Sequence, residues 1–435
     1  MKSISWTIVA GLVALLWTAI ATAEGVPKIT AEERQAVVST LVHSLQHRYV
    51  LAEKGAAIAQ EIARRSEDGE FSTSDDPQTL ARTLSKTLWQ VSQDLHLRVF
   101  YDGPVAARQP ADSSGANQET PRPYEAHLRP DGLGVLEVRK LTGPRQDLAA
   151  AMDEVAEAEA LIIDLRTCPG GEMGMPAVLA SYLFDEPALL LYYESRDGER
   201  DPIYTERLPE GSPSFDGKPI YVAISSRTGS GCEEMAFDLK HHDKAILVGE
   251  KTAGAGLGSR TGTTDLGHGF EAFIPDTKPV HPHFEGGFEG VGVAPDIATP
   301  ASQAITTARL SALSALLSSP RDGAARENLR GLFLEAALER EQAQRQRVRT
   351  ARSFAPYLGK YEGEREIQLT AGRLYYQAGD GLYRSELSAT KEGDFSLAGT
   401  RSQRLRFERN EQGRVIGLKI SEPGGTKWRD LVPKL

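Results

Sequence analysis

A serine at position 230 lies where an apolar stretch passes through a loop of small residues into a helical pattern. The stretch 220–224 predicts a buried strand, and the spacing of charged and apolar residues from Glu233 to Lys240 predicts a helix. A serine at such a turn exposes its hydroxyl, while the helix N-terminus offers free N–H groups to developing negative charge. Ser230 is therefore a candidate nucleophile; the alternative is that it only caps the helix.

Other side chains in the chain are also able to bind a metal or act as nucleophiles. His281 and His283 resemble a metal-binding pair, but no third ligand stands at a recognisable spacing, so we expect a loop and no metal. Cys232 is a weaker nucleophile candidate than Ser230, because its place in the helix points it in another direction. Serine chemistry is thus the stronger hypothesis.

Composition and charge exclude several classes of function. The net charge is −10 and there is no long basic run, which argues against nucleic acid as a main partner. Residues 1–23 combine Lys2, an apolar stretch and an Ala-Thr-Ala cleavage site, which predicts a secretory signal peptide; an uncleaved anchor is the alternative. No later apolar stretch approaches the length that spans a bilayer. We expect an exported chain, periplasmic or extracellular, with no membrane span in its mature part.

The order of patterns predicts how the chain is divided. Helical spacing dominates the first part, strands alternate with helices from Gly132, and six short strands with glycine turns follow residue 354. Alternation of this kind predicts an α/β core, and the short strands predict a small antiparallel barrel or sandwich. The expected parts are the signal peptide (1–23), a helical N-terminal domain (24–102), a linker (103–131), the core (132–300), a helical connector (301–352) and a C-terminal β domain (353–435).

Four segments of the core, in this order, resemble the C-terminal processing (tail-specific) peptidase family. LIIDLRTCPGG resembles the family's Asp-Leu-Arg turn, SSRTGSGCEEMAFDLK its nucleophile element, VGEKTAGAG the following turn and FEGVGVAPDI the closing motif. The resemblance covers roughly residues 135–297 and implies a ClpP/crotonase-like core of repeated ββα units with Ser230 as nucleophile. Residues 354–435 resemble a small β domain often appended to exported serine hydrolases.

The resemblance also implies the remaining site residues. In the larger branch of the family a lysine in the glycine turn is the base, but Ala255 stands at that position. The chain is therefore similar to the branch that includes tricorn protease and interphotoreceptor retinoid-binding protein modules. Its scheme needs no cofactor and implies His96 as base and Glu289 as its support, with Glu285 as a rival. The oxyanion donors implied are the amides of Gly170 or Gly171 and of Gly231.

We therefore expect a serine hydrolase, most simply a peptidase, that acts on peptide or protein substrates; the oligomeric state stays open. A non-enzymatic binding module for apolar ligands or peptides, on a degenerate peptidase fold, is the alternative that Ala255 and Leu95 favour. A third hypothesis is a scaffold whose C-terminal β domain makes the interaction. Cys168 and Cys232 flank the implied oxyanion glycines, either as a bridge beside the site or as two buried thiols.

Overall fold

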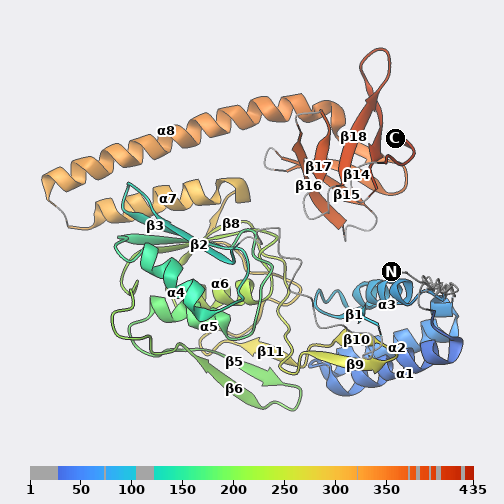
Figure 1. Cartoon of the computed structure of the whole chain (residues 1–435). Helices are drawn as coiled ribbons and strands as arrows, with labels where there is room; N and C mark the ends of the chain where they lie inside the picture. Colours follow the sequence, from blue (N-terminus) through green and yellow to red (C-terminus); the bar gives the residue numbers. More distant parts are fainter. Residues whose placement is uncertain are drawn as a thin grey trace, which may run out of the picture. The chain divides into compact units, whose positions relative to one another are not determined.

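The computed structural model describes most of the chain. The described residues are 28–72, 75–103, 122–320, 322–370, 373–378, 383–390, 393–397, 403–422 and 427–435, with only the backbone described at 343–344, 346–352 and 383–384. The predicted signal peptide, 1–23, and residues 104–121 of the predicted linker lie outside these ranges. Within them, no helix is both long and apolar enough to cross a membrane. The chain forms two compact units, which are described separately (Figure 1).

The first unit is built from three helices and a small sheet. Its elements are α1 (Ala31–Arg48), α2 (Ala52–Glu67), the short helix η1 (Glu70–Ser72), α3 (Pro77–Ser92), β1 (Arg98–Tyr101), β9 (Thr263–Gly267) and β10 (Phe270–Phe273). α1 begins at a capping box, because Glu33 N donates to Thr30 Oγ1 and Thr30 N donates to Glu33 Oε2. Asp76 caps α3 by accepting from Thr79 N at 2.9 Å.

The sheet of this unit joins parts of the chain that are far apart in sequence. Its strand order is β1-β10-β9, and β1 pairs antiparallel with β10 so that Arg98 lies opposite Phe273. Residues 263–274 alternate in the manner of a hairpin, and β9 and β10 pair antiparallel. The pattern did not predict that the hairpin belongs to the same compact unit as the N-terminal helices.

The second unit contains the core and the C-terminal barrel. A six-stranded sheet has the order β12-β8-β7-β4-β3-β2, and all its pairs are parallel except β2 with β3. Three further strands pair in the order β11-β5-β6. The core elements are β2 (Tyr124–Leu128), β3 (Leu133–Val138), α4 (Arg145–Glu154), β4 (Ala160–Asp164), α5 (Met175–Ala180), η4 (Ser181–Leu183), β5 (Leu189–Ser195), β6 (Arg200–Tyr204), β7 (Ile220–Ile224), α6 (Gly231–His241), β8 (Ile246–Gly249), β11 (Thr277–Val280), β12 (Ile297–Ala298), α7 (Ala301–Ser318) and α8 (Gly323–Phe354).

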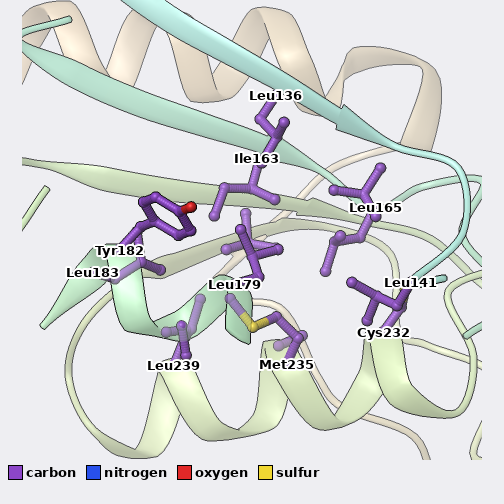
Figure 2. Packing of buried hydrophobic residues seen from close by; sticks show 14 of the residues in the cluster. Leu136, Leu141, Ile163, Leu165, Leu179, Tyr182, Leu183, Cys232, Met235 and Leu239 are labelled. Carbon is purple, nitrogen blue, oxygen red and sulfur yellow. The ribbon is translucent and has the colours of Figure 1, made fainter. Parts of the chain in front are cut away.

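Both faces of the parallel sheet are covered, which explains the uninterrupted apolar runs of its central strands. On one face Ile163 of β4 packs in the cluster that holds Leu179 of α5 and Met235 of α6 (Figure 2). On the other face Ile162 packs in the cluster that holds Leu313 of α7. Neighbouring residues of a strand point to opposite faces, so β4 contributes to both cores.

The C-terminal part is a nearly closed antiparallel barrel. It follows η5 (Ala355–Tyr357) and consists of β13 (Gly359–Tyr361), β14 (Arg365–Thr370), β15 (Arg373–Ala378), β16 (Tyr383–Ala389), β17 (Phe395–Leu397), β18 (Arg404–Arg409), β19 (Val415–Ile420) and β20 (Val432–Pro433). The strands pair in chain order, and a bridge between Lys434 and Tyr361 brings the last strand next to the first. Tyr361, Leu374, Leu405 and Leu418 are among the residues that fill its interior.

The predicted fold class is confirmed, but the predicted count of six barrel strands is wrong. Among the described residues the barrel has eight strands, and the two that were missed are β16 and β20. β16 has the sequence YRSELSA, in which small and charged residues mask the alternation, and β20 is only two residues long and includes a proline. Neither has a strong strand pattern of its own, and pairing with neighbouring strands makes each of them a strand.

Candidate active site

Loops at one edge of the parallel sheet form the candidate site. β4, β7 and β8 are adjacent and parallel, with Asp164 opposite Ala223 and Ala223 opposite Val248. The segments that follow these strands therefore leave the sheet at the same edge. They are the glycine turn after β4 (165–174), the loop before α6 (225–230) and the glycine loop after β8 (250–257).

Ser230 has an unusual backbone conformation at the start of α6. Its φ is 52° and its ψ is −127°, a combination that non-glycine residues rarely adopt. Strain of this kind costs about 1–3 kcal/mol and persists only where the surrounding contacts impose it. At the start of the helix the side chain of Glu233 holds the backbone of Ser230, since the Ser230 amide donates to Glu233 Oε2 at 2.9 Å. The serine is thus held at a sharp turn between β7 and α6.

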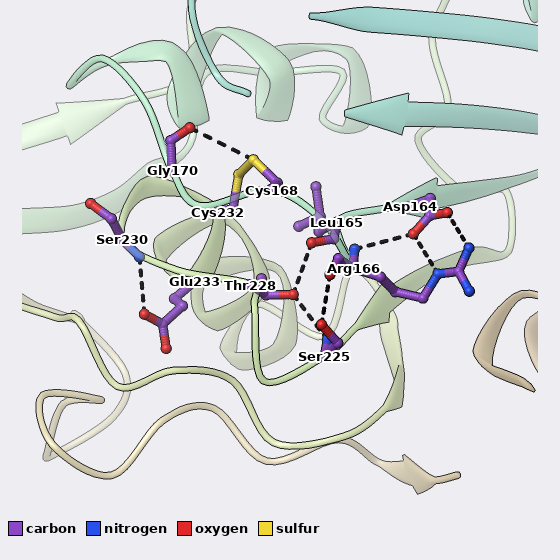
Figure 3. Close-up of a disulfide and its surroundings, with 10 residues drawn as sticks. All are labelled: Asp164, Leu165, Arg166, Cys168, Gly170, Ser225, Thr228, Ser230, Cys232 and Glu233. Atoms are coloured by element: carbon purple, nitrogen blue, oxygen red, sulfur yellow. Dashed lines mark hydrogen bonds and ion pairs between the residues drawn. A yellow bond between two sulfur atoms is a disulfide. The ribbon is translucent and has the colours of Figure 1, made fainter. Parts of the chain in front are cut away.

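Two hydroxyl groups fasten this loop to the end of β4 (Figure 3). Thr228 Oγ1 donates to the carbonyl of Leu165 at 2.8 Å, and Ser225 Oγ donates to the carbonyl of Arg166 at 2.6 Å. Arg166 in turn forms two hydrogen bonds with both oxygens of Asp164, at 2.8 and 2.7 Å. The Asp-Leu-Arg turn therefore supports the loop that presents Ser230.

Gly170 lies directly against Ser230. A Cβ atom built on Gly170 would be 2.6 Å from the Ser230 Cβ and 3.1 Å from its Oγ, and the glycine has a φ of +116°. Only glycine fits such a position. The amide nitrogen of Gly171 lies 3.8 Å from the place where Gly231 would carry a Cβ. The implied oxyanion glycines are therefore brought together around Ser230.

His96 lies within hydrogen-bond distance of Ser230. Its Nε2 is 3.0 Å from Ser230 Oγ, although 134 positions separate the two residues. The segment Asp94–His96 belongs to the second compact unit, as does Ser230. The His96 amide donates to Asp94 Oδ1 at 2.8 Å, which fixes the backbone that presents the imidazole. Asp94 was not singled out from the sequence; an aspartate two positions before a candidate base was the available signal.

Glu233 connects the loop before α6 with the glycine loop after β8. Its Oε1 accepts from Thr252 Oγ1 at 2.5 Å and from Gly254 N at 2.6 Å, and its Oε2 accepts from Ala255 N at 2.8 Å and from Ser230 N at 2.9 Å. Burial raises the pKa of Glu233, and these hydrogen bonds oppose the increase. The sequence had indicated Glu233 only as the start of the predicted helix after Ser230. That its carboxylate accepts hydrogen bonds from both loops was not predicted.

Glu289 holds the next two amides of the same glycine loop. Its Oε2 accepts from Gly256 N at 2.7 Å and from Leu257 N at 3.1 Å. Its rival Glu285 is exposed. That Glu289 supports the His96 ring stays a prediction. Ala255 is buried where the larger branch has its lysine, and Lys251 is exposed.

Cys168 and Cys232 form a disulfide, which settles the alternative that the sequence left open. The bond joins the glycine turn after β4 to the first turn of α6 (Figure 3). The cysteines are 64 positions apart, and closing a loop of that length stabilises a fold by about 4 kcal/mol in the chain-entropy model.

The histidines of the 281–283 loop pack against the end of α6. Ring centroids of His281 and His242 are 4.6 Å apart, and those of His281 and His283 are 5.7 Å apart. His281 Nδ1 accepts from His283 N at 3.1 Å. Among the described residues no group of three or more His, Cys, Asp or Glu side chains is arranged as a metal site. The metal-free site stays a prediction.

Acid is expected to destabilise this cluster. Burial, together with the neighbouring His242, His241 and His283, lowers the pKa of His281 from 6.5 to about 4. Between these values the unfolded chain binds a proton that the folded chain does not, so stability is lost as pH falls from 6.5 towards 4. His281→Gln should reduce that loss by about 2 kcal/mol in urea unfolding curves. The exposed His127→Gln is the control, and equal acid sensitivity of both variants would contradict the assignment.

Two buried carboxyl groups lie one turn apart on α6. Glu234 Oε2 accepts from Tyr193 of β5 at 2.6 Å, whereas neither oxygen of Asp238 has a hydrogen-bond partner among the described residues. Burial raises the pKa of Glu234 to about 7, and burial together with the charge of Glu234 raises the pKa of Asp238 well above its usual value. At least one of the two is therefore protonated near neutral pH.

Alkaline conditions are expected to weaken α6 through this pair. An unfolded glutamate ionises near pH 4.5, but burial raises the pKa of Glu234 in the folded protein to about 7, so its contribution to stability is full in acid and is lost as pH rises through 7. Asp238→Asn should raise the free energy of unfolding by about 1–2 kcal/mol more at pH 8 than at pH 5. Denaturant titration at both pH values measures this difference. A gain that is the same at both would rule out ionisation as its cause.

Two family models match segments of this chain. Residues 132–299 match the model described as Peptidase family S41, and residues 17–130 match the model of the N-terminal domain of Peptidase_S41 in eukaryotic IRBP. Carboxyl-terminal-processing peptidase 3, chloroplastic, of Arabidopsis thaliana is 30% identical over 178 residues, which are 39% of this chain and 33% of that relative. A carboxyl-terminal-processing protease of Picosynechococcus sp. is 33% identical over 100 residues, 23% of each chain.

The chain therefore spans a third or less of the length of these curated relatives. Among solved structures, a photosystem II D1 C-terminal processing protease is similar with a TM-score of 0.44 and 16% identity, over 65% of this chain and 98% of that one. The two family models match the core and the N-terminal region in the expected order. Residues 132–299 are therefore similar to peptidase family S41.

Proposed function

We propose that the protein is an exported serine peptidase that cleaves peptide or protein substrates by acyl transfer. The observation that carries the proposal is the 3.0 Å separation of His96 Nε2 and Ser230 Oγ, because a general base must lie within about 3.2 Å of the heavy atom whose proton it removes. The strained backbone of Ser230 is a second support, since such conformations cluster at functional sites. The names of the curated relatives agree with this class of reaction.

In the proposed reaction His96 removes the Ser230 proton as Oγ attacks the scissile carbonyl. The ring must present an unprotonated Nε2, so its proton lies on Nδ1. The amides of Gly171 and Gly231 stabilise the tetrahedral oxyanion, and each such donor is typically worth about 3–4 kcal/mol. His96 then gives the proton to the leaving amine, and water hydrolyses the acyl-enzyme by the reverse steps. Glu289 stabilises the imidazolium.

A fluorophosphonate probe tests this function directly, because it labels only activated serines. The full exported chain should be labelled once, with the label on the peptide that contains Ser230, and it should hydrolyse peptide p-nitroanilides. Ser230→Ala should abolish labelling. A folded wild-type protein that neither reacts with the probe nor hydrolyses any peptide would instead indicate a binding module on a degenerate site.

Substitution distinguishes Glu289 from its rival. Glu289→Gln keeps an oxygen for the amides of Gly256 and Leu257 but removes the charge, so kcat should fall by about 10- to 100-fold with KM little changed. Glu285→Gln is the matched control, because Glu285 is exposed in the same loop, and it should retain wild-type kcat. The reverse order of effects would assign the role to Glu285.

Export is proposed from residues 1–23, and the disulfide supports it. Structural disulfides form and persist in oxidising compartments, such as the bacterial periplasm or the extracellular space. Cys168 and Cys232 are fully buried and paired, as expected for a chain that folds in such a compartment. N-terminal sequencing of the protein recovered outside the cytoplasm should begin at residue 24.

A further inference from the structure

The disulfide joins the two backbone segments that carry the proposed oxyanion donors. Cys168 stands two residues before Gly170 and three before Gly171, and Cys232 directly follows Gly231. Both cysteines are fully buried, and the Sγ of Cys168 lies 3.7 Å from the carbonyl oxygen of Gly170. The crosslink is therefore next to both donors without being exposed to substrate.

Residues 169–171 and residues 229–231 lie in contact, but few of their side chains are able to form hydrogen bonds with one another. Pro169, Gly170 and Gly171 on one side, and Gly229 and Gly231 on the other, carry no polar side chains. Between the segments, Gly229 N donates to the carbonyl of Cys168 at 3.0 Å.

The far side of the turn is held separately. Leu141 N donates to Gly170 O at 3.0 Å, and Glu172 N donates to Leu141 O at 2.7 Å. These contacts fasten the turn to Leu141 rather than to α6. The glycine-rich parts of the two segments are thus joined by backbone contact and by the disulfide, while Ser225 and Thr228 make their hydroxyl contacts further along the turn, at Arg166 and Leu165.

The distance between the turn and the start of α6 matters because the two segments are in close contact around Ser230. The Gly170 Cα faces the Ser230 Cβ, and Gly171 N lies 3.8 Å from the Cβ position of Gly231. Oxyanion donors act only when they lie about 2.7–3.1 Å from the oxyanion, so a small shift of one segment weakens transition-state binding more than substrate binding.

We propose that the Cys168–Cys232 disulfide is a positioning element that sets the distance between the Gly171 and Gly231 amides, an inference that rests on the proposed acyl transfer. Loss of the crosslink then lowers kcat and leaves KM nearly unchanged. If the disulfide served only global stability, its loss would lower the melting temperature and leave kcat and KM unchanged in the folded protein.

The test compares wild type with Cys168→Ala/Cys232→Ala on a peptide p-nitroanilide, well below the melting temperature of the variant. We expect kcat to fall by about 10- to 100-fold with KM within about threefold. Affinity for a peptide boronic acid, whose adduct places an oxygen at the oxyanion site, should fall in parallel. Met152→Ala, a fully buried change in α4, is the control for lost stability and should keep wild-type kcat.

Reduction of the folded wild type gives a second measurement that does not depend on the variant folding. A phosphine reductant opens the bond, alkylation and mass measurement give the reduced fraction, and kcat should fall with that fraction and return on reoxidation. An unchanged kcat in the folded double variant or in the reduced enzyme would overturn the inference while leaving the proposed function intact. A wild type without hydrolysis or probe labelling would reject both.

Discussion

Ser230→Ala and His96→Ala should each lower kcat by about 10⁴- to 10⁶-fold, and the double variant should be no slower than the slower single variant. The reason is that the 3.0 Å contact makes the two side chains a single unit, in which the imidazole has no function without the hydroxyl and the hydroxyl is not activated without the imidazole. Steady-state hydrolysis of a peptide p-nitroanilide by all three variants measures the effect.

Lys251→Ala is the matched control for the identity of the base. Lys251 is exposed in the glycine loop, near the place where the larger branch of the family has its lysine, and its loss should leave kcat within about twofold of wild type. Multiplicative losses in the double variant, or a collapse of activity in Lys251→Ala, would show that His96 is not the base. Circular dichroism confirms that each variant is folded.

Gly170→Ala should lower kcat/KM by about 10²- to 10³-fold. The new Cβ would meet the Ser230 Cβ at 2.6 Å, so the proposed nucleophile must move, and a displacement of about 1 Å costs about 10²-fold in rate. The positive φ of +116° adds strain that is expected to reduce stability by about 1–3 kcal/mol. Kinetics and urea unfolding on the same preparation separate the two effects.

The same turn contains a matched control for this substitution. Gly174 also has a positive φ, +87°, but a Cβ there would meet nothing within 4 Å. Gly174→Ala should therefore have a similar backbone cost and keep kcat/KM near the wild-type value. Equal rate losses in both variants would indicate that backbone strain, rather than contact with Ser230, causes the defect.

Much of the core could be predicted because local pattern and burial agree there. The run 220–224 is β7, and the small residues that follow it are the loop that holds Ser230. β4 and β7 are buried on both faces, so each has the continuous apolar sequence of a parallel strand. Where a strand has an apolar pattern of its own, the sequence is sufficient to predict that strand.

What the sequence could not provide are contacts between distant segments. The meeting of His96 and Ser230 rested on a family resemblance, since nothing local brings the two residues together. The four hydrogen bonds of Glu233 come from its own loop and from residues 252–255, and no local pattern reports them. Likewise β16 becomes a strand through its partners β15 and β17.

The placement of the β9–β10 hairpin determines when the first unit is able to fold. Because β1 takes its only sheet neighbour within the described residues from residues 270–273, the N-terminal helices emerge from the ribosome long before their sheet is complete. Pairing across such a long separation is slow, since the closure entropy of the intervening chain must be overcome first. A fragment ending at residue 103 would leave β1 as a bare edge open to association with other chains, so soluble expression of this unit should require residues 261–274 as well.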